Sequence, residues 1–122
     1  MTGVLVSTTA LSAAEIARLV VDGEVSHRRA VDEHIDRIES VNGSLNAVVV
    51  PLFDDARRRA DAADAARARG ALGGPLAGVP MTVKESFDVA GVPTTAGVAA
   101  LTRPPSVVVR RSGGEEANEE AG

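Results

Sequence analysis

The chain has 122 residues, which limits it to one domain with a modest core. It carries 13 basic and 17 acidic residues, and the excess of acid comes from the glutamates in residues 113–122, so the first 112 residues are formally neutral. This balance excludes the basic surface that nucleic-acid binding requires, and the lack of cysteine excludes disulfides and a thiolate nucleophile.

No targeting or membrane-spanning segment is predicted. Residues 1–6 have no basic residue ahead of their short apolar stretch, and no stretch approaches the ~20 apolar residues that cross a bilayer. We therefore expect a cytoplasmic protein without membrane contact. Because the apolar residues are mainly alanine and valine, with only two aromatic residues, we also expect a weakly stabilised core.

Two helices are predicted between residues 11 and 43, and we expect them to form a hairpin. Ser12 and Glu15 have the spacing of a capping box at the start of the first helix, and Gly23 marks its end. Ser26 caps the second helix, which we expect to stop at Asn42-Gly43. Its apolar stripe consists of Val31, Ile35, Ile38 and Val41. Core packing is the favoured role of this stripe, and partner binding is the alternative.

A strand, a long helix and a second strand are predicted to follow. Residues 45–50 alternate too little for a surface strand and are typical of a buried one. An alanine-rich helix begins at Asp54-Asp55 and ends near Gly70, with charges that suit the helix dipole. Pro80–Lys84 is the second strand, because Pro80 favours an extended backbone before it. This order of elements predicts an α/β fold.

Two pairs of side chains on these helices have the spacing of functional sites. His27 and His34 are seven residues apart, but no third ligand stands at metal spacing, so we favour a solvated His27 and a His34 at the core boundary. Asp61 and Asp64 are i,i+3 neighbours, yet on an arginine-rich helix they are expected to form a charged outer face. No metal and no cofactor are predicted.

Residues 57–59 are three consecutive arginines. Phosphate contact is one interpretation of such a run. However, consecutive residues spread over most of the circumference of a helix, and aspartates flank the run at Asp54, Asp55 and Asp61. We therefore favour ion pairing between these arginines and the neighbouring aspartates.

Lys84 is the single lysine of the chain, against twelve arginines. Of the two residue types, only lysine loses its proton when it is desolvated, so only lysine can act as a base. Lys84 is placed at the end of the second predicted strand, and ligands bind at strand ends in α/β sheets. A surface lysine is the alternative. The surrounding sequence favours a functional residue, since Gly-Val-Pro occurs on both sides, at residues 78–80 and 91–93.

Residues 75–85 are Pro-Leu-Ala-Gly-Val-Pro-Met-Thr-Val-Lys-Glu, and residues 91–97 are Gly-Val-Pro-Thr-Thr-Ala-Gly. Both stretches resemble the lysine motif of the amidase signature family of amide hydrolases, and the resemblance covers about the first hundred residues. Glu85-Ser86 replaces a commoner Asp-Asn pair, and Val98 stands where serine is frequent. The resemblance implies that residues 1–101 are the N-terminal part of an α/β/α domain.

The resemblance also implies that Lys84 is the catalytic lysine of a Ser–cis-Ser–Lys triad. In such a triad a neutral lysine takes a proton through a bridging serine, which activates a second serine to attack the amide carbonyl. The family places both serines C-terminal to the lysine, in Gly-Ser-Ser-Gly-Gly-Ser and Gly-Gly-Ser runs that this sequence lacks. We assign no catalytic role to Ser86, Ser106 or Ser112, and we expect a truncated chain that is inactive alone.

The implied function is hydrolysis of a carboxamide C–N bond, with a small-molecule amide as substrate of a full-length protein. One alternative is the A subunit of glutamyl-tRNA amidotransferase, which releases ammonia from glutamine for partner subunits with the same triad. Another is a non-catalytic interaction fragment in which Lys84 is idle. The resemblance fails from Leu101, and the glycine- and glutamate-rich residues 102–122 are predicted to be a disordered acidic tail.

Overall fold

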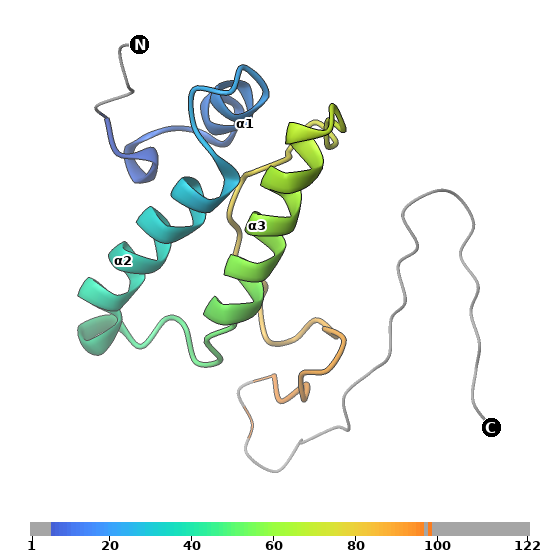
Figure 1. Cartoon of the computed structure of the whole chain (residues 1–122). Helices are drawn as coiled ribbons and strands as arrows, with labels where there is room; N and C mark the ends of the chain where they lie inside the picture. Colours follow the sequence, from blue (N-terminus) through green and yellow to red (C-terminus); the bar gives the residue numbers. More distant parts are fainter. Residues whose placement is uncertain (1–5, 97, 99–122) are drawn as a thin grey trace, which may run out of the picture. The chain divides into compact units, whose positions relative to one another are not determined.

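The computed structural model describes residues 6–96 and 98. The chain divides into an N-terminal unit, Met1–Met81, and a C-terminal unit, Thr82–Gly122. The N-terminal unit contains a short 3-10 helix, η1 (Thr8–Ala10), followed by α1 (Ala13–Val21), α2 (His27–Leu45) and α3 (Phe53–Ala68) (Figure 1). None of the described helices is long and apolar enough to cross a membrane. The predicted acidic tail lies outside the described residues.

The predicted capping box at the start of α1 is confirmed. The Ser12 hydroxyl accepts a hydrogen bond from the Glu15 N–H at 3.2 Å, and the Glu15 carboxylate accepts one from the Ser12 N–H at 2.7 Å. The helix ends at Val21, and Gly23 then takes a φ of 77°, a left-handed conformation that favours glycine. Both ends of this helix therefore follow from local sequence.

The hydrophobic core of the N-terminal unit lies where α1 meets the start of α2. Leu11 and Val79 cover its edge. Gly78, with a φ of 83°, passes so close that an added Cβ would lie 2.7 Å from a methyl group of Val20, so the close approach requires glycine here. The core itself consists of Ile16, Leu19, Val20, Val25 and Ala30.

The helices that pack along each other are α2 and α3, which run in opposite directions (Figure 1). Arg28 of α2 pairs with Asp61 of α3 at 2.7 Å, and Arg57 of α3 pairs with Asp32 of α2 at 3.0 Å. The hydrogen bond from Arg57, followed by that from Arg28, holds the pKa of Asp32 below its ordinary value. The prediction that the first two helices form a hairpin is therefore wrong, because these ion pairs join the second helix to the third.

The second helix is longer than predicted, and it continues through Asn42-Gly43 to Leu45. It ends where Asn46 adopts the left-handed conformation that asparagine tolerates, with φ 48° and ψ 41°. The Asn42 side chain then holds the departing chain, since it accepts from the Val48 N–H and donates to the Val48 carbonyl, both at 2.9 Å. Asn42 and Gly43 therefore lie inside the helix, because the left-handed Asn46 and the hydrogen bonds between Asn42 and Val48 place its end after Leu45.

No described residue belongs to a strand, so both strand predictions are wrong for this structure. In the first predicted strand, residues 45–50, Leu45 ends α2, and Val49 is 54% exposed rather than buried. In the second, residues 80–84 have no regular structure. A strand satisfies its backbone groups only beside a partner strand. The described residues provide none, and the α/β class stays a prediction for the complete domain.

α3 begins one residue before the predicted Asp54-Asp55 start and has both aspartates in its first turn. Ion pairing of the arginine run is confirmed. Arg58 and Arg59 both bind Asp55, at 3.0 and 2.7 Å, and Arg57 lies 3.8 Å from Asp54. Asp61, the third predicted partner, instead pairs with α2. These contacts are exposed or half-exposed, so each contributes little to stability by itself.

Candidate functional site

Lys84 belongs to the C-terminal unit and lies in an irregular segment. Its side chain is 72% exposed, and its ammonium nitrogen is 3.9 Å from a carboxylate oxygen of Glu85. The Lys84 carbonyl accepts a hydrogen bond from the Phe87 N–H at 3.0 Å, which closes a turn immediately after the lysine. A lysine becomes a base when it is desolvated and bonded to the group that it deprotonates. Among the described residues, no hydroxyl is hydrogen-bonded to this ammonium group.

The second Gly-Val-Pro sequence forms a closed turn shortly after Lys84. The Val92 N–H donates to the Val89 carbonyl at 3.0 Å, and Gly91 between them has a φ of 77°. The Thr94 hydroxyl, on a residue that is only 9% exposed, donates to the Asp88 carboxylate at 2.5 Å. The backbone turn and this side-chain bond together fix the chain that follows the lysine.

Replacing Thr94 with valine, which has the same shape, should loosen this turn. Loss of the Asp88–Thr94 hydrogen bond is expected to cost about 1 kcal/mol locally, so the Val92 amide should exchange its hydrogen about fivefold faster. Amide hydrogen exchange followed by NMR measures this rate. Thr95→Val is the matched control, and equal exchange in the two variants would contradict the proposed role of Thr94.

The segment around Lys84 also exposes large apolar side chains. Val83 is 51% exposed, Phe87 66% and Val98 47%. Apolar side chains that cluster at a surface mark a region where another chain segment or molecule binds. Lys84 therefore lies in a segment whose large apolar side chains are exposed.

Asp64 and His27, predicted to be solvated, form a partly buried contact between α3 and α2. The Asp64 carboxylate accepts from the backbone N–H groups of His27 and Arg28, at 2.8 and 3.0 Å, and lies 2.9 Å from the His27 Nδ1. His27 is 8% exposed. Burial alone would raise the pKa of Asp64, but the hydrogen bonds from Arg28 and His27 outweigh it and hold that pKa below its ordinary value.

Asp64 is thus a cap for α2 supplied by another helix, and the predicted outer face is correct only for Asp61, whose side chain is 57% exposed. His34 is half-buried, as predicted, with its Nδ1 2.8 Å from the Ala30 carbonyl. Within residues 6–96 and 98, no group of three or more His, Cys, Asp and Glu side chains has the arrangement of a metal site. His27 thus contacts α3 through Asp64, whereas the His34 ring contacts the backbone of its own helix.

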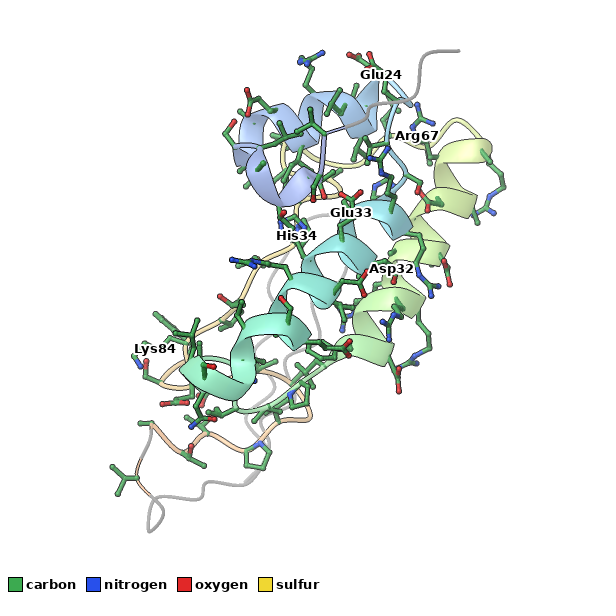
Figure 2. All side chains as sticks on the ribbon, turned by 90° about the vertical axis from the view of Figure 1, so that its left-hand side faces the viewer. Glu24, Asp32, Glu33, His34, Arg67 and Lys84 are labelled. Atoms are coloured by element: carbon green, nitrogen blue, oxygen red, sulfur yellow. The ribbon has the colours of Figure 1, made fainter. Side chains whose placement is uncertain are left out.

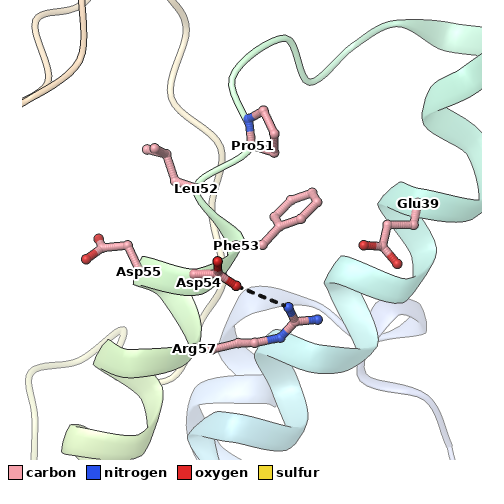
Figure 3. Close-up of a pocket in the computed structure, with 7 residues that line it drawn as sticks. All are labelled: Glu39, Pro51, Leu52, Phe53, Asp54, Asp55 and Arg57. Atoms are coloured by element: carbon pink, nitrogen blue, oxygen red, sulfur yellow. Dashed lines mark ion pairs between the residues drawn. The ribbon is translucent and has the colours of Figure 1, made fainter.

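A shallow hollow of about 450 Å³ lies where the chain enters α3 (Figure 3). The Phe53 ring stands in it, and Arg57 and Asp54 form an ion pair at its edge. Arg57 also binds Asp32, and the Asp54 side chain is 99% exposed. These charges are satisfied by each other or by water, so the hollow has no polar group that requires a ligand.

The sequence matches the family model described as Amidase over residues 29–111. Over 107 residues it is 46% identical to the A subunit of the glutamyl-tRNA(Gln) amidotransferase of Salinispora arenicola, covering 84% of this chain and 22% of that protein. It is 45% identical over 89 residues to the indoleacetamide hydrolase of Bradyrhizobium diazoefficiens, covering 73% of this chain and 17% of that protein. The chain therefore spans about a fifth of the length of these curated relatives.

The structure of this chain is also similar to part of a solved structure. The solved structure is described as an unexpected vestigial protein complex that reveals the evolutionary origins of an s-triazine catabolic enzyme. The TM-score is 0.74 at 38% identity, and the match covers 79% of this chain and 21% of that chain. The inhibitor-bound form of that complex matches equally well. The helical arrangement described above is thus also found inside a much longer polypeptide.

Proposed function

Because this chain belongs to the amidase family, we propose that it is the lysine-bearing part of an enzyme that hydrolyses a carboxamide C–N bond. The observation that carries this proposal is the placement of Lys84. It is the single lysine of the sequence, and both halves of its motif, residues 75–85 and 91–97, lie inside the matched region. The substrate of the complete enzyme would be a small-molecule amide.

In this proposal Lys84 is the proton acceptor of a Ser–cis-Ser–Lys triad. The neutral amine takes a proton from the bridging serine, which in turn takes the proton of the nucleophilic serine as that oxygen attacks the amide carbonyl. Backbone N–H groups stabilise the oxyanion, and the C–N bond breaks as the proton passes to the leaving amine. Water then attacks the acylated serine, which releases the carboxylic acid and restores the serine hydroxyl. This chemistry needs no metal. Both serines would come from polypeptide outside this sequence, so we propose that the 122-residue chain alone is inactive.

The exposed side chains beside Lys84 support this assignment. Val83 and Phe87 would be covered when the rest of such a domain packs on the segment. That packing would also exclude water from Lys84, and desolvation favours the neutral amine that the mechanism needs. The turn closed by the hydrogen bond between Asp88 and Thr94 would fix the conformation of the chain that follows Lys84.

A hybrid enzyme tests the proposal. Residues 1–101 replace the corresponding part of the B. diazoefficiens indoleacetamide hydrolase, a relative at 45% identity. We expect the hybrid to hydrolyse indoleacetamide and the purified 122-residue chain to show no activity. Hydrolysis by the 122-residue chain itself, or a folded hybrid without activity beside an active parent enzyme, would refute the proposal.

A second candidate function is that of the A subunit of glutamyl-tRNA(Gln) amidotransferase, the name that several of the relatives carry. In that case the ammonia released from glutamine would pass to partner subunits. A hybrid with the S. arenicola relative tests this candidate. Glutamine hydrolysis that requires the partner subunits would favour it, whereas activity toward indoleacetamide in the other hybrid alone would favour the amidase.

A further inference from the structure

Arg69 differs from the other arginines of the described residues in its place in the fold. Nine arginines lie within residues 6–96 and 98, of which one is inside α1, three are inside α2 and four are inside α3. Arg69 is the remaining one, and it caps the C-terminal end of α3. Its neighbour Arg67 lies inside α3, where a terminal guanidinium nitrogen donates to the Val21 carbonyl at 3.0 Å (Figure 2). Arg69, in contrast, has no side-chain hydrogen bond or ion pair within the described part of the chain.

The chain that follows Arg69 forms an exposed loop beyond the end of α3 (Figure 1). Residues 70–74 are Gly-Ala-Leu-Gly-Gly, and all of them are exposed. The first two close the end of the helix, since their N–H groups donate to the carbonyls of Arg67 and Ala66 at 2.9 and 3.0 Å. The N–H groups of residues 72–74 donate to no backbone carbonyl among the described residues. Exposed loops of small residues are preferred sites of proteolytic cleavage.

The backbone around Arg69 opens more easily than the backbone around an arginine inside a helix. A protease binds its substrate as an extended strand, so several residues on each side of the bond must leave their secondary structure. At Arg69 only the hydrogen bonds that end α3 must open, and helix ends fray. Arg37 is also exposed and has no side-chain partner within the described residues, but it lies in the middle of α2. Cleavage there requires the helical turns on both sides to unfold.

We propose that the bond between Arg69 and Gly70 is a processing site for an arginine-specific protease. A carboxylate in the recognition pocket of such a protease binds a guanidinium group, and that of Arg69 is free to enter the pocket. Hydrolysis breaks the bond between the Arg69 carbonyl carbon and the Gly70 nitrogen. The hydroxyl group of a water molecule adds to the carbon, and its hydrogen adds to the nitrogen. The cut separates the three α-helices from the polypeptide that carries Lys84.

The helical product of this cut should stay folded. The polar contacts that join α3 to α1 and α2 come from Arg67, Asp64 and Asp61, which all precede the cut. The buried residues of the hydrophobic core also precede it, and Val79, which covers the edge of the core, is the apolar contact that belongs to the other product. Processing therefore yields a helical unit without the catalytic-lysine motif.

Limited digestion of the 122-residue chain with an arginine-specific protease, followed over time by mass spectrometry, tests the proposal. We expect the first cut within the described residues to follow Arg69. Two synthetic peptides, residues 33–41 and 65–73, contain the Arg37 and Arg69 bonds outside the fold. The ratio of the cleavage rate at Arg69 to that at Arg37 should be at least about tenfold higher in the chain than in the peptides. An earlier cut inside a helix, or the same ratio in the chain and in the peptides, would overturn the proposal.

Two variants of the whole chain locate the site. Arg69→Lys keeps the charge but removes the arginine, so the helices should stay joined to Lys84 for at least about tenfold longer. Arg37→Lys is the matched control and should leave cleavage after Arg69 unchanged. Equally fast cleavage after Arg67 in the Arg69→Lys variant would overturn the assignment to Arg69. Circular dichroism of the cut wild-type chain should show that its helices are retained, and their loss would contradict the release of a folded unit.

Discussion

Replacing Lys84 with arginine in the active hybrid enzyme should lower kcat by about 10⁴-fold or more, the scale seen when one member of a catalytic triad is removed. Arginine keeps a positive charge of similar reach, but it stays protonated at any working pH and so cannot accept the serine proton. Lys84→Met, which removes the charge and the amine, should be equally inactive. Steady-state hydrolysis of indoleacetamide measures both variants, and KM should change little, because the lost interaction belongs to the proton transfer.

The controls separate chemistry from folding. Arg69→Lys exchanges the same two residue types at an exposed position of the hybrid and should keep full activity. Thr94→Val, which loosens the turn after the lysine, should lower kcat far less than Lys84→Arg. If Lys84→Arg keeps more than about a tenth of kcat, Lys84 is not the proton acceptor and the amidase assignment of this residue is wrong.

Local signals in the sequence predicted the parts of the fold that depend on neighbours in the chain. The capping box of Ser12 and Glu15 needs only residues three apart, and the Arg59–Asp55 pair only residues four apart. The left-handed Gly23 ends α1 for the same local reason. The place of Lys84 in its motif is also a local property, although its catalytic role remains a proposal.

Errors arose where distant residues decide the outcome. Asp64 looked like part of a solvated face because nothing near it in sequence reveals that it reaches the first turn of α2, 36 residues before it in the chain. The same contact buries His27. The strand predictions at residues 45–50 and 80–84 failed because an extended segment needs a partner strand, and sequence periodicity does not show whether one is present.

One turn of α3 satisfies the ends of both preceding helices. Asp64 binds free N–H groups at the N-terminus of α2, and Arg67, one turn later, binds the carbonyl of Val21 at the C-terminus of α1. Each charge has the sign that the helix dipole favours at that end. Arg67 passes so close to Gly23 that an added Cβ would lie 2.5 Å from its guanidinium group. The turn between α1 and α2 is therefore held by α3, which gives the helical unit a tertiary structure of its own.

Such a unit bears on the alternative of a non-catalytic interaction fragment, because that role requires the helices to fold without a larger domain. Asp64→Ala should then be the most destabilising change among the exposed or half-buried charges of α3, with a loss of about 2–3 kcal/mol in the free energy of unfolding, since two helix N–H groups and the His27 ring lose their acceptor together. Urea denaturation of the 122-residue chain, followed by circular dichroism, measures the loss.

Asp61→Ala is the matched control, because it removes the same type of side chain one turn earlier in α3. Asp61 forms an exposed ion pair with Arg28, so its loss should cost no more than about 0.5 kcal/mol. The pH dependence gives an independent check. The folded-state pKa of Asp64 lies below its ordinary value of 3.8, so its contribution is complete above that value and disappears as the pH falls through the folded-state pKa. The stability difference between wild type and Asp64→Ala should therefore shrink in acid. A difference that stays constant from neutral pH into acid, or equal losses for Asp61→Ala and Asp64→Ala, would show that Asp64 does not hold α2 and α3 together.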